Sequence, residues 1–165
     1  MNSGDKLNPL NPYAQTKIII EKILEDISKA DREWSIACLR YFNPIGAHNS
    51  GLIGDDPLSV ENSNLMPEMI KVVTGSKNYL NVFGDDYETS DGTGVRDYIH
   101  IMDLSKAHVA ALDYINKNNG INFFNIGTGE GVSVLELIKT FEKVSGLSIP
   151  IKISNRREGD CAVCF

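Results

Sequence analysis

The amino-acid sequence predicts an α/β fold with a sheet of parallel strands. Short apolar segments such as 34–42 and 122–126 have the length of strands, and segments with helical periodicity separate them. This alternation is typical of parallel sheets whose strands are connected through helices. Of the 165 residues, 42% are hydrophobic and 23% are charged, which is typical of one packed domain.

The first predicted helix begins at Asn11 and Pro12. Asn11 suits the N-cap, and Pro12 suits the first helical position because its missing N–H needs no partner there. Apolar residues at helical spacing then predict a helix that ends at about Ala30. The face expected to pack on the core is formed by Ile20, Ile23, Leu24 and Ile27.

The segment 34–42 is almost continuously apolar, which predicts a strand covered on both faces. The stretch 43–63 is rich in Gly, Asn, Asp and Pro and predicts a long loop, of the kind that usually has a function. A short helix over 65–73, stopped at Gly75, and a strand over 80–83 follow.

The remaining segments continue the alternation of strand and helix. Asp103 is expected to cap a helix that runs to about Asn116. Ser133 and Glu136 form a capping box for another helix, which ends near Gly146. The extended segments are predicted at 98–101, 122–126 and, as the last strand, 149–153.

Charge and cysteine content restrict the class of protein. The formal net charge of −6 argues against nucleic acid as a partner, because domains that bind it usually carry a basic excess. No apolar run approaches the roughly 18 residues of a membrane span, and the first residues do not form a signal peptide. Three cysteines without framework spacing indicate a reducing compartment. We expect a cytoplasmic protein with no membrane partner.

The stretch NPYAQTK places Tyr13 four residues before Lys17 in the first predicted helix. Residues four apart lie on one helical face, about 6 Å apart along the axis. An ammonium group beside a phenol favours the phenolate, the form that accepts a proton. Such a pair is also common by chance, so the motif taken alone favours the polar first turn of an ordinary helix over a catalytic pair.

The glycines of FNIGTGEGVS lie between a predicted strand and a predicted helix. Gly127, Gly129 and Gly131 are spaced G-x-G-x-G rather than G-x-G-x-x-G. No acidic residue ends a second strand about 20 residues later, as a dinucleotide site requires. The spacing therefore favours a tight turn that needs positive φ over a dinucleotide loop.

Cysteine and histidine spacing gives little support for a metal site. Cys161 and Cys164 have the spacing of a zinc or redox pair, but there is no second pair, and Cys38 falls in a predicted buried strand. We assign surface positions without a metal role to His48, His100 and His108.

Several stretches together resemble UDP-glucose 4-epimerase, a family of the extended short-chain dehydrogenase/reductase superfamily. They are RYFNPIGAH (40–48), NSNLMPEM (62–69), NVFGDDYETSDGTGVRDYIHIMDLSKAH (81–108), FNIGTGEGVSVLEL (124–137) and RREGDCAVC (156–164). The resemblance extends from about residue 8 to residue 165. It implies that 1–44 form the last part of a Rossmann NAD-binding domain. It also implies that 45–165 form mainly a substrate-binding region, with a returning Rossmann strand and helix near 80–126.

The resemblance also implies a chemistry. The tyrosine matching Tyr13 takes the proton of the sugar 4-hydroxyl while hydride passes from C4 to a tightly held NAD. Hydride then returns to the other face of the 4-keto sugar, which interconverts UDP-glucose and UDP-galactose. Lys17 would hydrogen-bond the nicotinamide ribose and keep Tyr13 reactive, and Phe42 would lie beside the nicotinamide.

For the UDP-sugar substrate, the resemblance assigns Arg96 and Arg157 to the diphosphate and Asp160 to the ribose. Guanidinium suits this role because its planar fork meets two phosphate oxygens. Cys164 matches a position near the sugar 2-substituent, where a thiol would leave room for UDP-N-acetyl sugars. The remaining expected substrate residues are Asn43, Asn64, Leu65, Asn81 and Phe83.

Some features of the family have no counterpart in the sequence. Its Gly-rich NAD loop and its catalytic Ser or Thr are not found before Asn11, and its closing helices are not found after RREGD. We therefore expect a fragment, or a truncated product starting at Met1, that is inactive alone; the full-length family member is expected to be a homodimer. Alternatives are a related nucleotide-sugar dehydratase or UDP-glucuronate epimerase, and a non-catalytic nucleotide-sugar-binding remnant.

Overall fold

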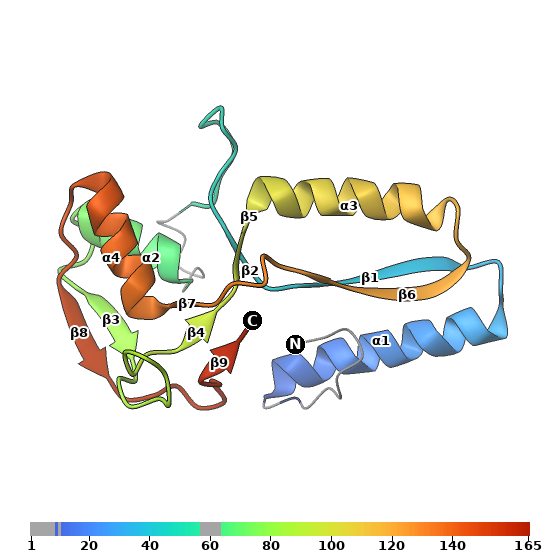
Figure 1. Cartoon of the computed structure of the whole chain (residues 1–165), viewed down its shortest axis with the longest axis horizontal. Helices are drawn as coiled ribbons and strands as arrows, with labels where there is room; N and C mark the ends of the chain where they lie inside the picture. The colour runs from blue at the N-terminus through green and yellow to red at the C-terminus, as the bar shows by residue number, and fades with distance from the viewer. Residues whose placement is uncertain (1–8, 10, 57–63) are drawn as a thin grey trace.

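A computed structural model describes residue 9 and residues 11–56 and 64–165 (Figure 1). Part of the predicted loop, 57–63, therefore lies outside the described residues. The chain forms two halves that lie side by side, one built around a pair of long strands and the other around two short helices and small sheets (Figure 1). The predicted α/β class with parallel strands is confirmed.

The first half is a parallel strand pair between two helices. β1 (Ser35–Tyr41) pairs along its full length with β6 (Gly120–Ile126). The helices α1 (Pro12–Ala30) and α3 (Ile101–Ile115) lie on opposite sides of this pair (Figure 1). The strand predicted over 34–42 therefore has a helix on each face, but only Cys38 in β1 is buried, and Tyr41 at its end is exposed.

The predicted bounds of α1 are confirmed, and its predicted inner face is partly wrong. The Asn11 side chain accepts a hydrogen bond from the Ala14 N–H at 2.8 Å, as an N-cap does. Ile20 and Ile23 are exposed. Glu21 turns toward the sheet instead, because both of its carboxylate oxygens accept hydrogen bonds from Arg40 of β1 at 2.7 Å. The side of α1 that contacts β1 therefore includes a charged residue, which the apolar pattern did not predict.

The second half contains the main hydrophobic core. α2 (Leu65–Val73) and α4 (Val134–Ser145) pack beside the parallel pair β3 (Leu80–Phe83) and β8 (Ile151–Ser154). The predicted capping box at the start of α4 is present, and Gly146 ends that helix with φ 71°. The buried residues of the cluster are Met69, Val72, Leu80, Val82, Ile138 and Ile149.

Short strands connect the two halves. β2 (Asn43–Ile45) pairs with β5 (Tyr98–His100), and β4 (Val95–Arg96) lies between β7 (Val132–Ser133) and β9 (Val163–Cys164). The strand predicted over 149–153 is β8, and it is not the last strand, because β9 follows. A two-residue strand has no periodicity by which the sequence could reveal it.

The start of α3 also differs from the prediction. The helix begins before Asp103, and His100 is its N-cap, with the ring Nδ1 accepting from the Met102 N–H at 3.2 Å. Among the helices of the described ranges, none combines the length and apolarity needed to cross a bilayer.

Candidate active site

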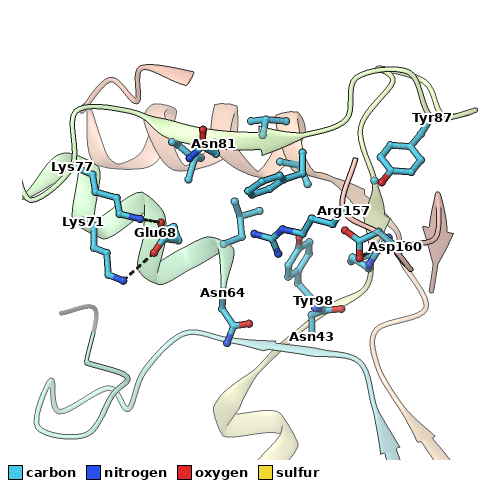
Figure 2. Close-up of a pocket in the computed structure, with 17 residues that line it drawn as sticks. Asn43, Asn64, Glu68, Lys71, Lys77, Asn81, Tyr87, Tyr98, Arg157 and Asp160 are labelled. Carbon is cyan, nitrogen blue, oxygen red and sulfur yellow. Dashed lines mark hydrogen bonds and ion pairs between the residues drawn. The ribbon is translucent and has the colours of Figure 1, made fainter. Parts of the chain in front are cut away.

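A cavity of about 690 Å³ opens in the second half, beside α2 and β3 (Figure 2). Eight residues that the resemblance assigned to the substrate line it. They come from well-separated stretches of the chain, and the fold brings them to one place. They are Asn43, Asn64, Leu65, Asn81, Phe83, Arg96, Arg157 and Asp160.

Regular elements hold most of the cavity wall. Asn43 begins β2, and its N–H donates to the Asp97 carbonyl at 3.0 Å. Asn64 and Leu65 lie at the N-terminus of α2, where the helix dipole favours negative charge. Asn81 and Phe83 lie on β3, which the core holds in place. The wall is therefore largely formed before a ligand arrives.

Two guanidinium groups give the cavity a positive side. Arg157 lies over the Phe83 ring, 3.9 Å from its centroid, and within the described part of the chain it forms no ion pair. Arg96 donates to the Val95 carbonyl at 2.8 Å, and its Nη2 lies 3.7 Å from an Asp160 carboxylate oxygen. One distant carboxylate does not neutralise two guanidinium groups, so this side suits an anion with several oxygen atoms.

A charged cluster that sequence reasoning missed lines another part of the cavity. The Glu68 carboxylate accepts hydrogen bonds from Lys71, at 2.9 Å, and from Lys77 (Figure 2). Burial alone would raise the pKa of Glu68, but the hydrogen bonds from Lys77 and Lys71 outweigh burial and lower it. The spacing of Glu68 and Lys71 on one helix was a usable signal; the position of Lys77 depends on a turn in which its N–H bonds back to Lys71.

Tyr13 and Lys17 share one face of α1, as predicted. The Lys17 ammonium lies 4.9 Å from the centroid of the Tyr13 ring, and the tyrosine is 71% exposed. Neither residue lines the cavity. The pair begins α1 where the carboxyl ends of β1 and β6 meet the second half of the molecule (Figure 1). In open α/β sheets, ligands bind at this end of the strands.

Phe42 and Cys164 lie near the cavity without lining it. Phe42 follows β1, and its N–H donates to the Ile126 carbonyl at 3.1 Å. Cys164 pairs with Arg96 across β9 and β4, and burial raises the pKa of its thiol. All three cysteines are free.

The glycine turn after β6 binds a carboxylate of the protein itself. Asp97 is 0% exposed and accepts hydrogen bonds from the N–H groups of Thr128 and Gly129 at 2.8 to 3.0 Å, and from the Thr128 hydroxyl at 2.7 Å. A Cβ on Gly127 would lie 2.3 Å from an Asp97 oxygen, and Gly129 has φ 78°. The interpretation as a tight turn with positive φ is confirmed at Gly129, and N–H groups of this turn are bound by Asp97.

The fold and the site define a class: part of a Rossmann-type protein with a cavity of about 690 Å³, lined by charged and polar residues, beside the carboxyl ends of its parallel strands. The chain belongs to the NAD dependent epimerase/dehydratase family, whose model matches residues 1–127.

Proteins similar to this chain include several UDP-glucose 4-epimerases. That of Bacillus subtilis (strain 168) is 55% identical over 159 residues, which are 96% of this chain and 47% of that protein. The crystal structure of the Bifidobacterium longum enzyme with NAD+ and UDP has a TM-score of 0.92 at 50% identity, over 98% of this chain and 48% of that one. The Stenotrophomonas maltophila enzyme, with NAD and formylated UDP-arabinopyranose, has a TM-score of 0.91 at 47% identity, over 97% of this chain and 47% of that one. The chain thus spans about half the length of the relatives it matches.

Proposed function

We propose that this chain is the substrate-binding part of a UDP-glucose 4-epimerase and holds UDP-glucose or UDP-galactose in the 690 Å³ cavity. One observation carries the proposal: the guanidinium of Arg157 lies over Phe83 in the cavity with no ion pair in the described ranges. A diphosphate supplies negative charge to pair with the Arg157 guanidinium, and the planar guanidinium binds its oxygens in two parallel hydrogen bonds. Arg96 contributes to the same diphosphate, and Asp160 accepts from a ribose hydroxyl.

The residues at the carboxyl ends of β1 and β6 fit the nicotinamide end of NAD. Lys17 supplies a donor for the ribose hydroxyls, and Phe42 supplies an apolar surface. The turn at 127–129 cannot hold the pyrophosphate, because Asp97 already uses its N–H groups. When bound, NAD accepts hydride from the sugar C4 and returns it.

Tyr13 moves the proton in this proposal. Its phenol oxygen takes the proton of the sugar 4-hydroxyl as the C4–H bond breaks, and gives it back when hydride returns. Lys17, one turn further along α1, stabilises the negative charge on the phenol oxygen. Side-chain amides at the cavity, such as those of Asn43 and Asn64, hold the sugar and diphosphate so that C4 faces the tyrosine.

A chimera tests the function directly. In the chimera, this chain replaces the matched 47% of the Bacillus subtilis relative, and the remaining part of that relative is kept. We expect the chimera to interconvert UDP-glucose and UDP-galactose, and the isolated 165-residue chain not to do so with added NAD. A folded chimera without turnover would refute the proposal, and turnover by the isolated chain would refute its second part.

A non-catalytic role as a nucleotide-sugar-binding protein is the second candidate. It is favoured by the contrast between a cavity formed within this chain and a Tyr13 side chain that is 71% exposed. Calorimetry of the isolated chain with UDP and with NAD measures nucleotide binding separately from cofactor binding. Binding of UDP without NAD, together with an inactive chimera, would establish the binding role.

Cys164 supports a finer proposal on substrate range. Its thiol is small and lies beside Arg96 in the strand pairing of β9 with β4, so it leaves room for a sugar 2-acetamido group. We expect the chimera to accept UDP-N-acetyl sugars. Cys164→Tyr should lower the ratio of turnover on UDP-N-acetylglucosamine to turnover on UDP-glucose; an unchanged ratio would contradict this.

Homodimer formation and a cytoplasmic location remain predictions. The location is supported by three free cysteines, which fit a reducing compartment. Sedimentation of the chimera tests the dimer: a monomer at micromolar concentration would contradict it.

A further inference from the structure

The tyrosine Tyr87 has a buried hydroxyl with no hydrogen-bond partner among the residues that the structure describes. The residue is 7% exposed, lines the cavity, and was not identified from the sequence. Buried polar groups are nearly always paired, because an unmade hydrogen bond in the interior costs free energy. This hydroxyl therefore needs a specific explanation.

The position of the Tyr87 ring is set by its surroundings. The turn that carries it is closed by a hydrogen bond from its own N–H to the Gly92 carbonyl at 2.9 Å. A Cβ on Gly84 would lie 2.6 Å from the ring, so a glycine is needed there for the ring to fit. On the ring face, the guanidinium of Arg156 lies 4.2 Å from the centroid and also donates to Asp86 at 2.7 Å. The hydroxyl is thus held in place rather than free to find a partner.

The direction of the Tyr87 hydroxyl indicates that it can contact a ligand in the cavity. Figure 2 shows the ring with its hydroxyl end toward the part of the cavity where Arg157 and Asp160 lie. Arg157, the proposed diphosphate ligand, lies over Phe83 on this side of the cavity. A phenol O–H directed at a phosphate oxygen is a charge-assisted hydrogen bond, stronger than one to a neutral acceptor.

We infer that Tyr87 is a ligand-binding residue whose hydroxyl donates to a phosphate oxygen of a bound nucleoside diphosphate. The inference rests on the proposed function, since it assigns the ligand of the same cavity. Among the residues that the structure describes, the hydroxyl has no partner, and the bound diphosphate supplies one. The free protein thus bears a cost that binding removes, which favours the bound state.

Tyr87→Phe tests this by removing one oxygen atom and keeping the ring. Loss of one hydrogen bond to a charged acceptor should raise the Kd for UDP about tenfold, measured by calorimetry. The free energy of unfolding without ligand should stay the same or rise, because an unpaired polar group has been removed from the interior. If the hydroxyl had only a structural role, Tyr87→Phe would lower the free energy of unfolding and leave the Kd for UDP unchanged.

The control is Tyr79→Phe, which removes a hydroxyl from an exposed tyrosine of the same half and should change neither quantity. An unchanged Kd in Tyr87→Phe, or a fall in its free energy of unfolding, would overturn the inference. If wild type binds UDP and Tyr87→Phe binds it equally well, only the role of Tyr87 fails. If neither the wild-type isolated chain nor the wild-type chimera binds UDP, the proposed function fails and the inference with it.

Discussion

The two halves of the molecule differ in how they hold their functional residues. In the half with the cavity, six buried side chains pack together between α2, β3 and α4. In the half with Tyr13, α1 has no buried residue, and Ile19, Ile20 and Ile23 are exposed. A fully buried aliphatic side chain contributes about 1.5–3 kcal/mol, so the cavity rests on a core that α1 lacks.

In the proposed function, this difference separates binding from catalysis. The cavity walls are attached to core elements, so the chain itself sets the distances among the proposed substrate residues. The Tyr13–Lys17 pair stands on a helix whose best-defined contact with the sheet is the Glu21–Arg40 ion pair. We therefore expect the cavity to bind its ligand independently of the groups that act on it.

Removing the Tyr13 hydroxyl should give the largest effect, because it should lower turnover without changing the binding of UDP. In the chimera, Tyr13→Phe should lower turnover about 10²- to 10⁴-fold, the usual contribution of a general acid or base. The Kd for UDP should not change, because Tyr13 does not line the cavity. Steady-state kinetics and calorimetry measure the two quantities. A variant with full turnover would mean that another group moves the proton.

Core and surface apolar residues should differ in their effect on stability. Met69→Ala removes a 0% exposed side chain and should lower the free energy of unfolding by about 2–5 kcal/mol. Ile23→Ala, on the exposed side of α1, should change it by less than about 0.5 kcal/mol. Denaturant unfolding of the isolated chain measures both. Equal losses would show that α1 packs as tightly as the cavity half.

Arg157 should dominate the affinity for the diphosphate. Arg157→Ala should raise the Kd for UDP about 10- to 100-fold, because it removes a charge-assisted pair of hydrogen bonds. Lys152→Ala, which removes an exposed cation of the same half outside the cavity, is the matched control and should have little effect. If both variants weaken binding equally, the attraction comes from general charge rather than from the cavity.

The Glu68 cluster should give the smallest effect, visible as a pH dependence. Because the pKa of Glu68 lies below its ordinary value of 4.5 in the folded protein, its ion pairs stabilise the fold above that value. This stability is lost as the pH falls through the lowered pKa. The difference in unfolding free energy between wild type and Glu68→Gln should therefore be largest at neutral pH and shrink below 4.5. A difference independent of pH would contradict the account.

Local signals explain which elements the sequence could predict. The bounds of α1 and α4 depend on neighbouring residues, such as Asn11 with Pro12 and Ser133 with Glu136, and these were predicted correctly. The short strand β4 depends on Val95 pairing with a residue far along the chain, which no local pattern reveals. The same holds for the contact of α1 with the sheet, where Glu21 accepts a hydrogen bond from Arg40 of β1.

The site shows the same division. Eight of the residues that line the cavity were expected from a resemblance between motifs, and the fold brings these eight together. Asp97 and Tyr87 were missed because their roles exist only in three dimensions. The Asp97 carboxylate binds the N–H of Thr128, which lies 31 residues further along the chain. The Tyr87 hydroxyl is buried by packing around its ring.

Titration of the isotope-labelled 165-residue chain with UDP, followed by amide NMR, tests the central claim most directly. We predict saturable shifts at Asn64, Phe83 and Arg157, with the amides of Tyr13 and Lys17 unchanged. Absence of shifts, or shifts that gather on α1 and leave the cavity residues unaffected, would contradict the claim that this cavity binds the nucleotide.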